Sequence, residues 1–225
     1  MIIAIDGPAG SGKSSVAKIL AKKLHFTFFD SGAMYRAITY LIINKSIDPN
    51  NEKQLAELLD SFTYKITFEN GEAAYFANGK DVTKEIRSRE VTKYVSDIAA
   101  LPSVRKALVT IQRRSAKNID AVFEGRDMGS VVFPEAQIKI FLNASADIRA
   151  QRRFQEILQK SPSEAKNLSL EKVKEDIIRR DHFDSTREHS PLTQAEDAKV
   201  IDASNLTLDE VVDKIIEYKE KIHKT

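Results

Sequence analysis

The sequence has 225 residues, enough for one α/β domain with a sizeable core, and a formal net charge of +2 that argues against general electrostatic binding to nucleic acid. It contains no cysteine, which excludes disulfides and thiolate metal sites and fits a reducing cytoplasm. The first apolar stretch meets Asp6 after only a few residues, so we expect neither a signal peptide nor a membrane anchor, and a cytoplasmic location.

A phosphate-binding loop follows the first predicted strand. Residues 2–5 form a continuous apolar run, typical of a strand buried on both faces of a parallel sheet. Residues 7–14 fit the pattern G-x-x-x-x-G-K-[ST], and an amphipathic helix comes next. Lys13 would reach the β- and γ-phosphates of a nucleoside triphosphate, and the Ser14 hydroxyl would ligate Mg²⁺. A dinucleotide fingerprint is excluded because Ser15 replaces its third glycine. The predicted ATP-binding residues are Gly7, Pro8, Ala9, Gly10, Ser11, Gly12, Lys13, Ser14 and Ser15.

Further short β-rich runs are separated by helical patterns. They lie at residues 26–29, 121–123, 138–142 and 199–201. This alternation predicts an α/β fold with an open, doubly wound parallel sheet flanked by helices. Ligands bind such sheets beyond the carboxyl ends of the strands. Polar residues follow three of the predicted strands, namely Asp6, Asp30 and the segment 124–127, so we expect the site there.

Residues 62–82 interrupt this alternation. Between residues 62 and 68 apolar and polar side chains alternate with a period of two, which indicates a strand with one buried face. Asn70-Gly71 and Asn78-Gly79 predict turns on either side of a second strand at residues 74–76. The segment is therefore predicted to be a small antiparallel insert in the α/β protein.

Candidate residues for a second substrate lie outside the loop. Tyr35 and Arg36, on a helix predicted at residues 31–43, offer an aromatic ring and a bidentate phosphate clamp. Arg126 and Asp127 stand together at a strand end, where unpaired charges are rarely buried. The pair Arg126 and Asp127 indicates a binding function rather than a core position. Taken alone, Tyr35 and Arg36 are better explained as part of a capped helix with a surface arginine.

Three arginines, Arg149, Arg152 and Arg153, share one helix face. A second group of arginines follows at residues 179–187, beyond a turn at residues 160–163. The pattern favours a flap that closes over phosphates and excludes water, with Arg153 among its catalytic arginines. For Arg149 a solvated surface position is an equally good interpretation.

Taken together, three segments resemble bacterial cytidylate kinase: residues 5–14, 30–36 and 125–134. The likeness continues through residues 78–83, 86–87, 104–105, 112–113 and 180–187, and so covers nearly the whole chain. It implies a P-loop kinase that transfers the γ-phosphoryl group of ATP, with Mg²⁺, to CMP or dCMP. It also implies a core at about residues 1–35, 100–150 and 190–225, a monophosphate-binding region with the antiparallel insert at about 36–99, and a helical lid at about 151–189.

The resemblance also implies which side chains contact the substrates. The residues expected around the acceptor nucleotide are Ser31, Tyr35, Arg36, Ser96, Arg105, Arg126, Asp127, Arg180, Asp184 and Arg187. Together with Lys13 of the loop and Arg153 of the flap, which the patterns above indicate, Arg180 and Arg187 are the residues expected to promote the transfer. Because an acceptor phosphate is already anionic, no strong general base is required, and the four histidines are interpreted as solvated or structural.

Other functions remain open at this stage. A related kinase could act on UMP, AMP, shikimate or gluconate, and a nucleotide-gated switch would need no acceptor at all. Cytosine and uracil exchange a donor for an acceptor at one ring position, so one side-chain rotation could reverse a preference between CMP and UMP. The expected partners are small molecules only, with no nucleic acid and no membrane, and the chain is expected to be a monomer.

Overall fold

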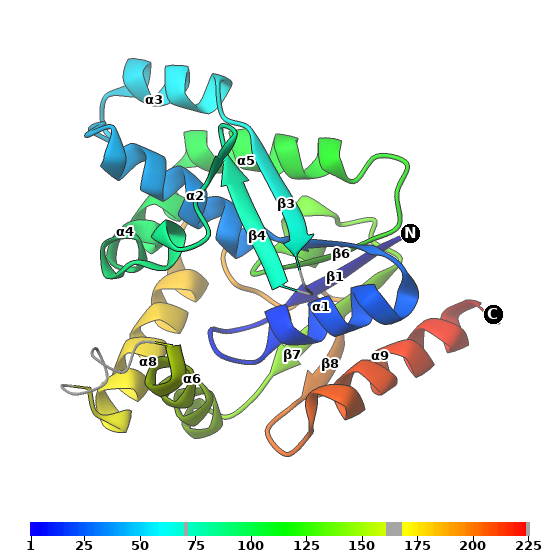
Figure 1. The fold of residues 1–225 in the computed structure, drawn as a ribbon. Coiled ribbons are helices and arrows are strands. Elements are labelled where there is room, and N and C mark those ends of the chain that lie inside the picture. Colours follow the sequence, from blue (N-terminus) through cyan, green and yellow to red (C-terminus); the bar gives the residue numbers. More distant parts are fainter. Residues whose placement is uncertain (70–71, 161–167, 224–225) are drawn as a thin grey trace. The chain divides into compact units, whose positions relative to one another are not determined.

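The computed structural model describes residues 1–69, 72–160 and 168–223 (Figure 1). The chain divides into two compact units. We call Met1–Phe28 with Asn118–Thr225 the loop unit, because it contains the phosphate-binding loop, and Phe29–Lys117 the insert unit. Across the described ranges, no helix is both long and apolar enough to cross a membrane.

A five-stranded sheet in the order β2-β6-β1-β7-β8 underlies the loop unit. The strands are β1 (Ile2–Asp6), β2 (Thr27–Asp30), β6 (Ala121–Gly125), β7 (Ile138–Asn143) and β8 (Lys199–Asp202), and β2 carries the chain into the insert unit. The central strand β1 runs parallel to both β6 and β7, with Ile3 opposite Val122 on one side and Ile138 on the other. The predicted parallel sheet is confirmed. Its carboxyl edge carries Asp6, Glu124 and Gly125.

Two helices pack on the sheet of the loop unit, α1 (Lys13–Leu24) and α9 (Leu208–His223). Apolar side chains at helical spacing on α1, Val16 and Leu20 among them, meet Val212 and Ile215 of α9 and the buried side chains of the sheet. The loop between β1 and α1 therefore starts and ends in rigid, well-packed elements.

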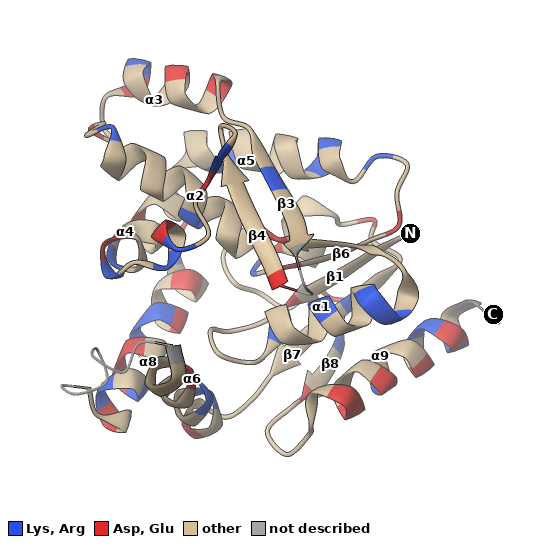
Figure 2. Cartoon of the chain, viewed as in Figure 1, with Lys and Arg blue, Asp and Glu red and all other residues tan. Residues whose placement is uncertain are grey.

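The loop unit also contains a second helical pair. α6 (Ala146–Lys160) and α8 (Leu170–Thr186) lie side by side and share a small apolar core of Ala150, Val173 and Ile177 (Figure 1). These helices carry most of the predicted lid, and the greater part of the turn predicted at residues 160–163 lies outside the described residues. Figure 2 shows basic and acidic positions following one another along α8.

The insert unit contains the predicted antiparallel strands. β3 (Tyr64–Glu69) pairs with β4 (Glu72–Ala77), and β4 pairs with β5 (Lys80–Asp81). Asn78 and Gly79 have φ of 49° and 77°, the left-handed pair that a two-residue hairpin turn requires. This confirms the insert and its second turn, whereas the turn predicted at Asn70-Gly71 lies outside the described residues.

Helices make up the rest of the insert unit that we describe. They are α2 (Ser31–Asn44), α3 (Glu52–Asp60), the 3₁₀ helix η1 (Glu85–Arg87), α4 (Arg89–Ala100) and α5 (Pro102–Ser115), and α2 is in contact with β4. Ile38 of α2, Leu59 of α3 and Tyr75 of β4 belong to one buried core. The Asp30 carboxylate accepts the Ala33 N–H at 2.7 Å and the Tyr75 hydroxyl at 3.1 Å, which fixes the start of α2.

Candidate active site

The phosphate-binding loop passes close to the sheet, and its glycines are needed for this. A Cβ on Gly7 would lie only 2.1 Å from the carbonyl oxygen of Leu142 in β7. Gly12 caps α1 with a φ of 96°, in the left-handed region that other residues avoid. As a glycine, Gly12 has no side chain to accept the first N–H groups of α1, and N–H groups in this position are suited to binding an anion. The loop thus has the geometry that its sequence predicts.

Lys13 is buried beside this loop, with 5% of its surface exposed. Its Nζ donates to the Pro8 carbonyl oxygen at 2.7 Å and lies 3.4 Å from the Ser11 Oγ. Burial, together with the positive charge of Arg126, lowers the pKa of Lys13 to about 7. An amine in this state becomes fully charged when an anion such as a phosphate group comes close to it.

The Ser14 hydroxyl donates to the Glu124 carboxylate at 2.6 Å. Glu124 is 4% exposed and lies near the carboxyl end of β6, the strand adjacent to β1. Its carboxylate orients the hydroxyl that the sequence predicts as a Mg²⁺ ligand. The sequence places Glu124 after a strand but indicates no role for it, because Ser14 lies 110 residues away in the chain.

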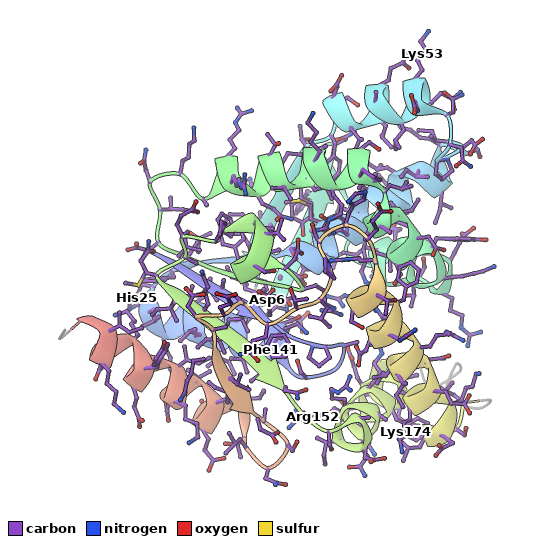
Figure 3. All side chains as sticks on the ribbon, turned by 180° about the vertical axis from the view of Figure 1, so that it is seen from behind. Asp6, His25, Lys53, Phe141, Arg152 and Lys174 are labelled. Atoms are coloured by element: carbon purple, nitrogen blue, oxygen red, sulfur yellow. The ribbon has the colours of Figure 1, made fainter. Side chains whose placement is uncertain are left out.

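Asp6 lies at the end of β1 (Figure 3) and holds the segment that follows β6. Its two carboxylate oxygens accept the N–H groups of Met128 at 2.8 Å and Gly129 at 2.7 Å. These residues begin the π-helix η2 (Met128–Val132). Burial raises the pKa of Asp6 to about 6, although the two N–H groups act in the opposite direction. Asp6 thereby positions the chain around Arg126.

Replacing Asp6 by alanine is expected to lower the free energy of unfolding by about 2–4 kcal/mol, because two buried N–H groups lose their acceptor. The folded state keeps a proton on Asp6 between pH 3.8 and about 6 that the unfolded state releases. This group therefore reduces stability as the pH rises through that window, and the variant should lack that dependence. Urea unfolding at several pH values measures both effects. The control is Asp97→Ala, at an exposed position of α4, whose free energy of unfolding should stay within about 0.5 kcal/mol of the parent. An equal loss of stability in both variants would contradict the role of Asp6 as acceptor for these N–H groups.

Asp184, on α8, lies at the centre of an arginine cluster. Its carboxylate accepts Arg126 Nε at 2.9 Å, and Arg180 Nε lies 3.9 Å away. Arg187 extends the cluster, with its guanidinium nitrogen 3.8 Å from the Asp127 carboxylate. Burial by itself would raise the pKa of Asp184, but the guanidinium groups of Arg126, Arg180 and Arg187 lower it. Five of the predicted acceptor residues are therefore brought together within the loop unit.

The positive charge of this cluster exceeds its negative charge. Three guanidinium groups face the carboxylates of Asp127 and Asp184. Burial and the charge of Arg126 lower the pKa of Arg180 to about 10. Among the described residues, the buried Nε of Arg180 has no hydrogen-bond partner. An anionic group would relieve the repulsion between the arginines and satisfy this donor, so the cluster is suited to binding phosphate.

The three arginines predicted on one face of α6 have different environments. Arg149 is buried and donates to the Ala9 carbonyl oxygen at 3.0 Å, which excludes the solvated interpretation. Arg152, labelled in Figure 3, donates to the Ser11 carbonyl oxygen at 3.3 Å and to the Ala203 carbonyl oxygen at 2.7 Å. Arg153 pairs with Glu156 at 2.7 Å, and its side chain is 41% exposed. The catalytic role of Arg153 stays a prediction.

The remaining predicted acceptor residues lie in the insert unit. Ser31 begins α2, followed one turn later by Tyr35 and Arg36. The Arg105 guanidinium lies 5.4 Å from the centre of the Tyr35 ring and donates to the Ala99 carbonyl oxygen at 3.1 Å. Arg36 donates to the carbonyl oxygen of Ile86 at 3.0 Å and to the hydroxyl of Thr92 at 2.9 Å. Ser96 lies on the adjoining helix α4 and is half-buried. This group combines cations, hydroxyls and an aromatic ring, as a nucleotide requires.

The sequence of the chain is similar to those of known proteins over nearly its whole length. A family model described as cytidylate kinase matches residues 3–221. The chain is 53% identical over 222 residues to a cytidylate kinase of Protochlamydia amoebophila, which covers 99% of this chain and 97% of that protein. The chain belongs to the cytidylate kinase family. A cytidylate kinase of Carboxydothermus hydrogenoformans is 46% identical over 217 residues, 96% of each chain. The resemblance drawn from the sequence motifs is confirmed.

Similarity to solved structures concerns the fold alone. The structure of a shikimate kinase from Bacteroides thetaiotaomicron matches with a TM-score of 0.51 at 14% identity and covers 98% of each chain. An uncharacterized protein from Eubacterium ventriosum matches with a TM-score of 0.53 at 16% identity, again over 98% of each chain. The α/β architecture of cytidylate kinases is thus shared with a small-molecule kinase of very different sequence.

Proposed function

We propose that this protein transfers the γ-phosphoryl group of ATP to CMP or dCMP, giving ADP and CDP or dCDP. Membership of the cytidylate kinase family supports the reaction. The observation that carries it is the presence, in one compact unit, of two cationic centres: Lys13 in its loop and the arginines around Asp184. Arg126 is close enough to Lys13 to lower its pKa. Two phosphate-bearing groups can therefore be held next to each other.

The donor phosphates are assigned to the loop from Gly7 to Ser15. Lys13 carries its charge to the β- and γ-phosphates and stabilises the charge that develops during transfer. Mg²⁺ would be held by the Ser14 hydroxyl, oriented by Glu124, and would neutralise phosphate charge when bound. In the described part of the chain, no cluster of three or more His, Asp or Glu side chains could hold a metal. Such an ion would thus rely mainly on the nucleotide phosphates.

The acceptor phosphate is assigned to Arg126, Arg180 and Arg187, with Asp127 and Asp184 keeping the guanidinium groups in place. In the insert unit, the family resemblance assigns base and phosphate contacts to Ser31, Tyr35, Arg36, Ser96 and Arg105. The protein needs to align two anionic groups and neutralise their repulsion, and alignment alone can contribute several kcal/mol to lowering the barrier. We assign residues 151–189, with α6 and α8, to the lid that excludes water.

An acceptor panel tests this function. ADP release from ATP–Mg²⁺ is measured with CMP, dCMP, UMP, AMP and GMP, and without any acceptor. We expect strong turnover with CMP and dCMP and little with the others. Turnover with AMP or GMP above that with CMP would overturn the proposed substrate. ATP hydrolysis that is indifferent to the acceptor would instead indicate a nucleotide switch.

Replacing Arg36 by alanine is expected to raise the KM for CMP about 10- to 100-fold, with kcat changed only a few-fold, because the lost contact is a charge-assisted one to the acceptor phosphate. Steady-state kinetics with varied CMP measure this, and thermal unfolding reports on the lost bonds to Ile86 and Thr92. Arg114→Ala, at an exposed position of α5, provides the matched control. A KM for CMP within twofold of the parent would remove Arg36 from the acceptor site.

A further inference from the structure

Ala9 of the phosphate-binding loop is held by an ion pair from two other elements. The Asp181 carboxylate, on α8, accepts the Ala9 N–H at 2.9 Å. Arg149, on α6, donates to the Ala9 carbonyl oxygen at 3.0 Å and is itself paired with Asp181. The pair therefore engages both backbone polar groups of one loop residue. Neither contact was predicted from the sequence, in which Ala9 and Asp181 are 172 residues apart.

This ion pair is shielded and firmly anchored. The side chains of Arg149 and Asp181 are only 9% and 18% exposed. Arg149 Nε also donates to the Ala144 carbonyl oxygen at 2.8 Å, which ties the guanidinium to the end of β7. A Cβ on Gly10 would lie 3.2 Å from the Cβ and the carbonyl oxygen of Arg149, so the loop packs directly against α6. Charged pairs in such surroundings couple more strongly than exposed pairs.

The position of Asp181 on α8 is informative. It follows Arg180 directly and precedes Asp184 by three residues, so it lies within one helical turn of the arginine cluster. One turn of a single helix thus contacts the donor loop and also carries residues of the cluster that is suited to phosphate. If an anion binds to the cluster and moves this turn, Ala9 moves with it, because Asp181 accepts the Ala9 N–H.

We propose that Asp181 and Arg149 form a positioning pair that couples the arginine cluster to the phosphate-binding loop, so that acceptor and ATP raise each other's affinity. The proposal rests on the proposed function for the identity of the acceptor. The carboxylate of Asp181 lies at the loop that is assigned to the triphosphate, and the two negative groups repel each other. The charge of Asp181 must therefore be balanced by Arg149 whenever ATP is bound.

A double-mutant cycle tests the charge balance. Titration calorimetry with ATP–Mg²⁺ alone gives the Kd for the parent, Asp181→Asn, Arg149→Gln and the double variant. Asp181→Asn should raise Kd about 3- to 10-fold, through loss of the strong acceptor for Ala9. Arg149→Gln should raise Kd about 30- to 100-fold, because it leaves an unpaired carboxylate near the triphosphate. The double variant should bind ATP more tightly than Arg149→Gln, and Arg149→Lys should recover most of the affinity.

A merely structural role predicts a different pattern. The effects of the two substitutions on the free energy of ATP binding would then add, and the loss of affinity would follow the loss of thermal stability. That pattern would overturn the proposal. The matched control is the exposed ion pair of Lys172 and Glu175 on the same helix, joined at 3.2 Å with side chains 54% and 62% exposed. Lys172→Gln and Glu175→Gln should leave Kd for ATP within twofold of the parent.

The coupling is measured by repeating the titration with a non-hydrolysable ATP analogue at saturating CMP. We expect saturating CMP to lower the Kd of the analogue at least about 5-fold in the parent and less than about 2-fold in Asp181→Asn. An equal decrease of this Kd in both proteins would overturn the coupling. If CMP fails to bind, the proposed function is wrong, but the double-mutant cycle with ATP alone still decides whether Asp181 and Arg149 position the loop.

Discussion

Replacing Lys13 by alanine is expected to lower kcat by about 10³-fold or more, because the charge that neutralises the transferring phosphoryl group is lost from a buried site. The side chain is 5% exposed, and its Nζ donates to the Pro8 carbonyl oxygen, which holds the charge within the loop. Steady-state kinetics with ATP–Mg²⁺ and CMP measure the loss. Lys22→Ala, in the exposed last turn of α1, should retain the parent kcat; a near-normal kcat in Lys13→Ala would overturn the assignment.

The same variant should differ from the parent in how its free energy of unfolding depends on pH. Burial lowers the pKa of Lys13 from 10.5 to about 7, so between these values the unfolded state holds a proton that the folded state has released. The free energy of unfolding of the parent therefore rises with pH across this window through Lys13, and Lys13→Ala should lack that rise. Because triphosphate favours the charged amine, ATP binding above pH 7 should take up protons. Calorimetry in two buffers of different ionisation enthalpy measures this uptake.

Replacing Asp184 by asparagine is expected to raise the KM for CMP about 100-fold and to lower the free energy of unfolding by about 3 kcal/mol. Asp184 is 4% exposed and pairs directly with Arg126 at 2.9 Å. Without its charge, Arg126, Arg180 and Arg187 repel one another and no longer point at a common position. Kinetics with varied CMP and chemical unfolding measure the two effects separately.

The pH dependence of the free energy of unfolding gives a further check on the role of Asp184. The neighbouring arginines hold its pKa below the ordinary value of 3.8, so its stabilising contribution is present above that value and is lost as the pH falls through the lowered pKa. The variant should lack this part of the acid transition. Glu175→Gln, with its carboxylate 62% exposed on the same helix, should change neither KM nor stability. An unaltered KM for CMP in Asp184→Asn would contradict its place at the acceptor site.

Features that depend only on residues close to one another in the sequence could be predicted from it. The phosphate-binding loop is contiguous, and its glycines, Lys13 and Ser14 report directly on the local backbone that phosphate needs. The strands of the sheet are short apolar runs, and the Asn78-Gly79 turn follows from the φ values that these residues tolerate. Their boundaries were predicted to within two residues; β6, for example, continues to Gly125.

Two interpretations needed the tertiary structure. The sequence could not decide whether Arg149 is solvated, because a helical spacing of three and four residues describes a face but not what covers it. In the structure the phosphate-binding loop covers that face at Arg149, whereas Arg153 pairs with Glu156 on its own helix. Among the acceptor residues, Arg126 and Asp127 were indicated by their place at a strand end, whereas Ser31, Ser96, Arg105 and Asp184 came from family resemblance alone.

The sequence by itself therefore determined the class of donor, the α/β fold and the antiparallel insert, because each is encoded in short-range backbone preference and hydrophobic period. Only the tertiary structure decided which charges meet. Asp6 holds Met128, Glu124 orients Ser14, and Asp181 binds Ala9, across 110 to 172 residues of chain. Such pairs are selected by burial, since a charge removed from water must find a partner wherever the packed elements bring one within reach.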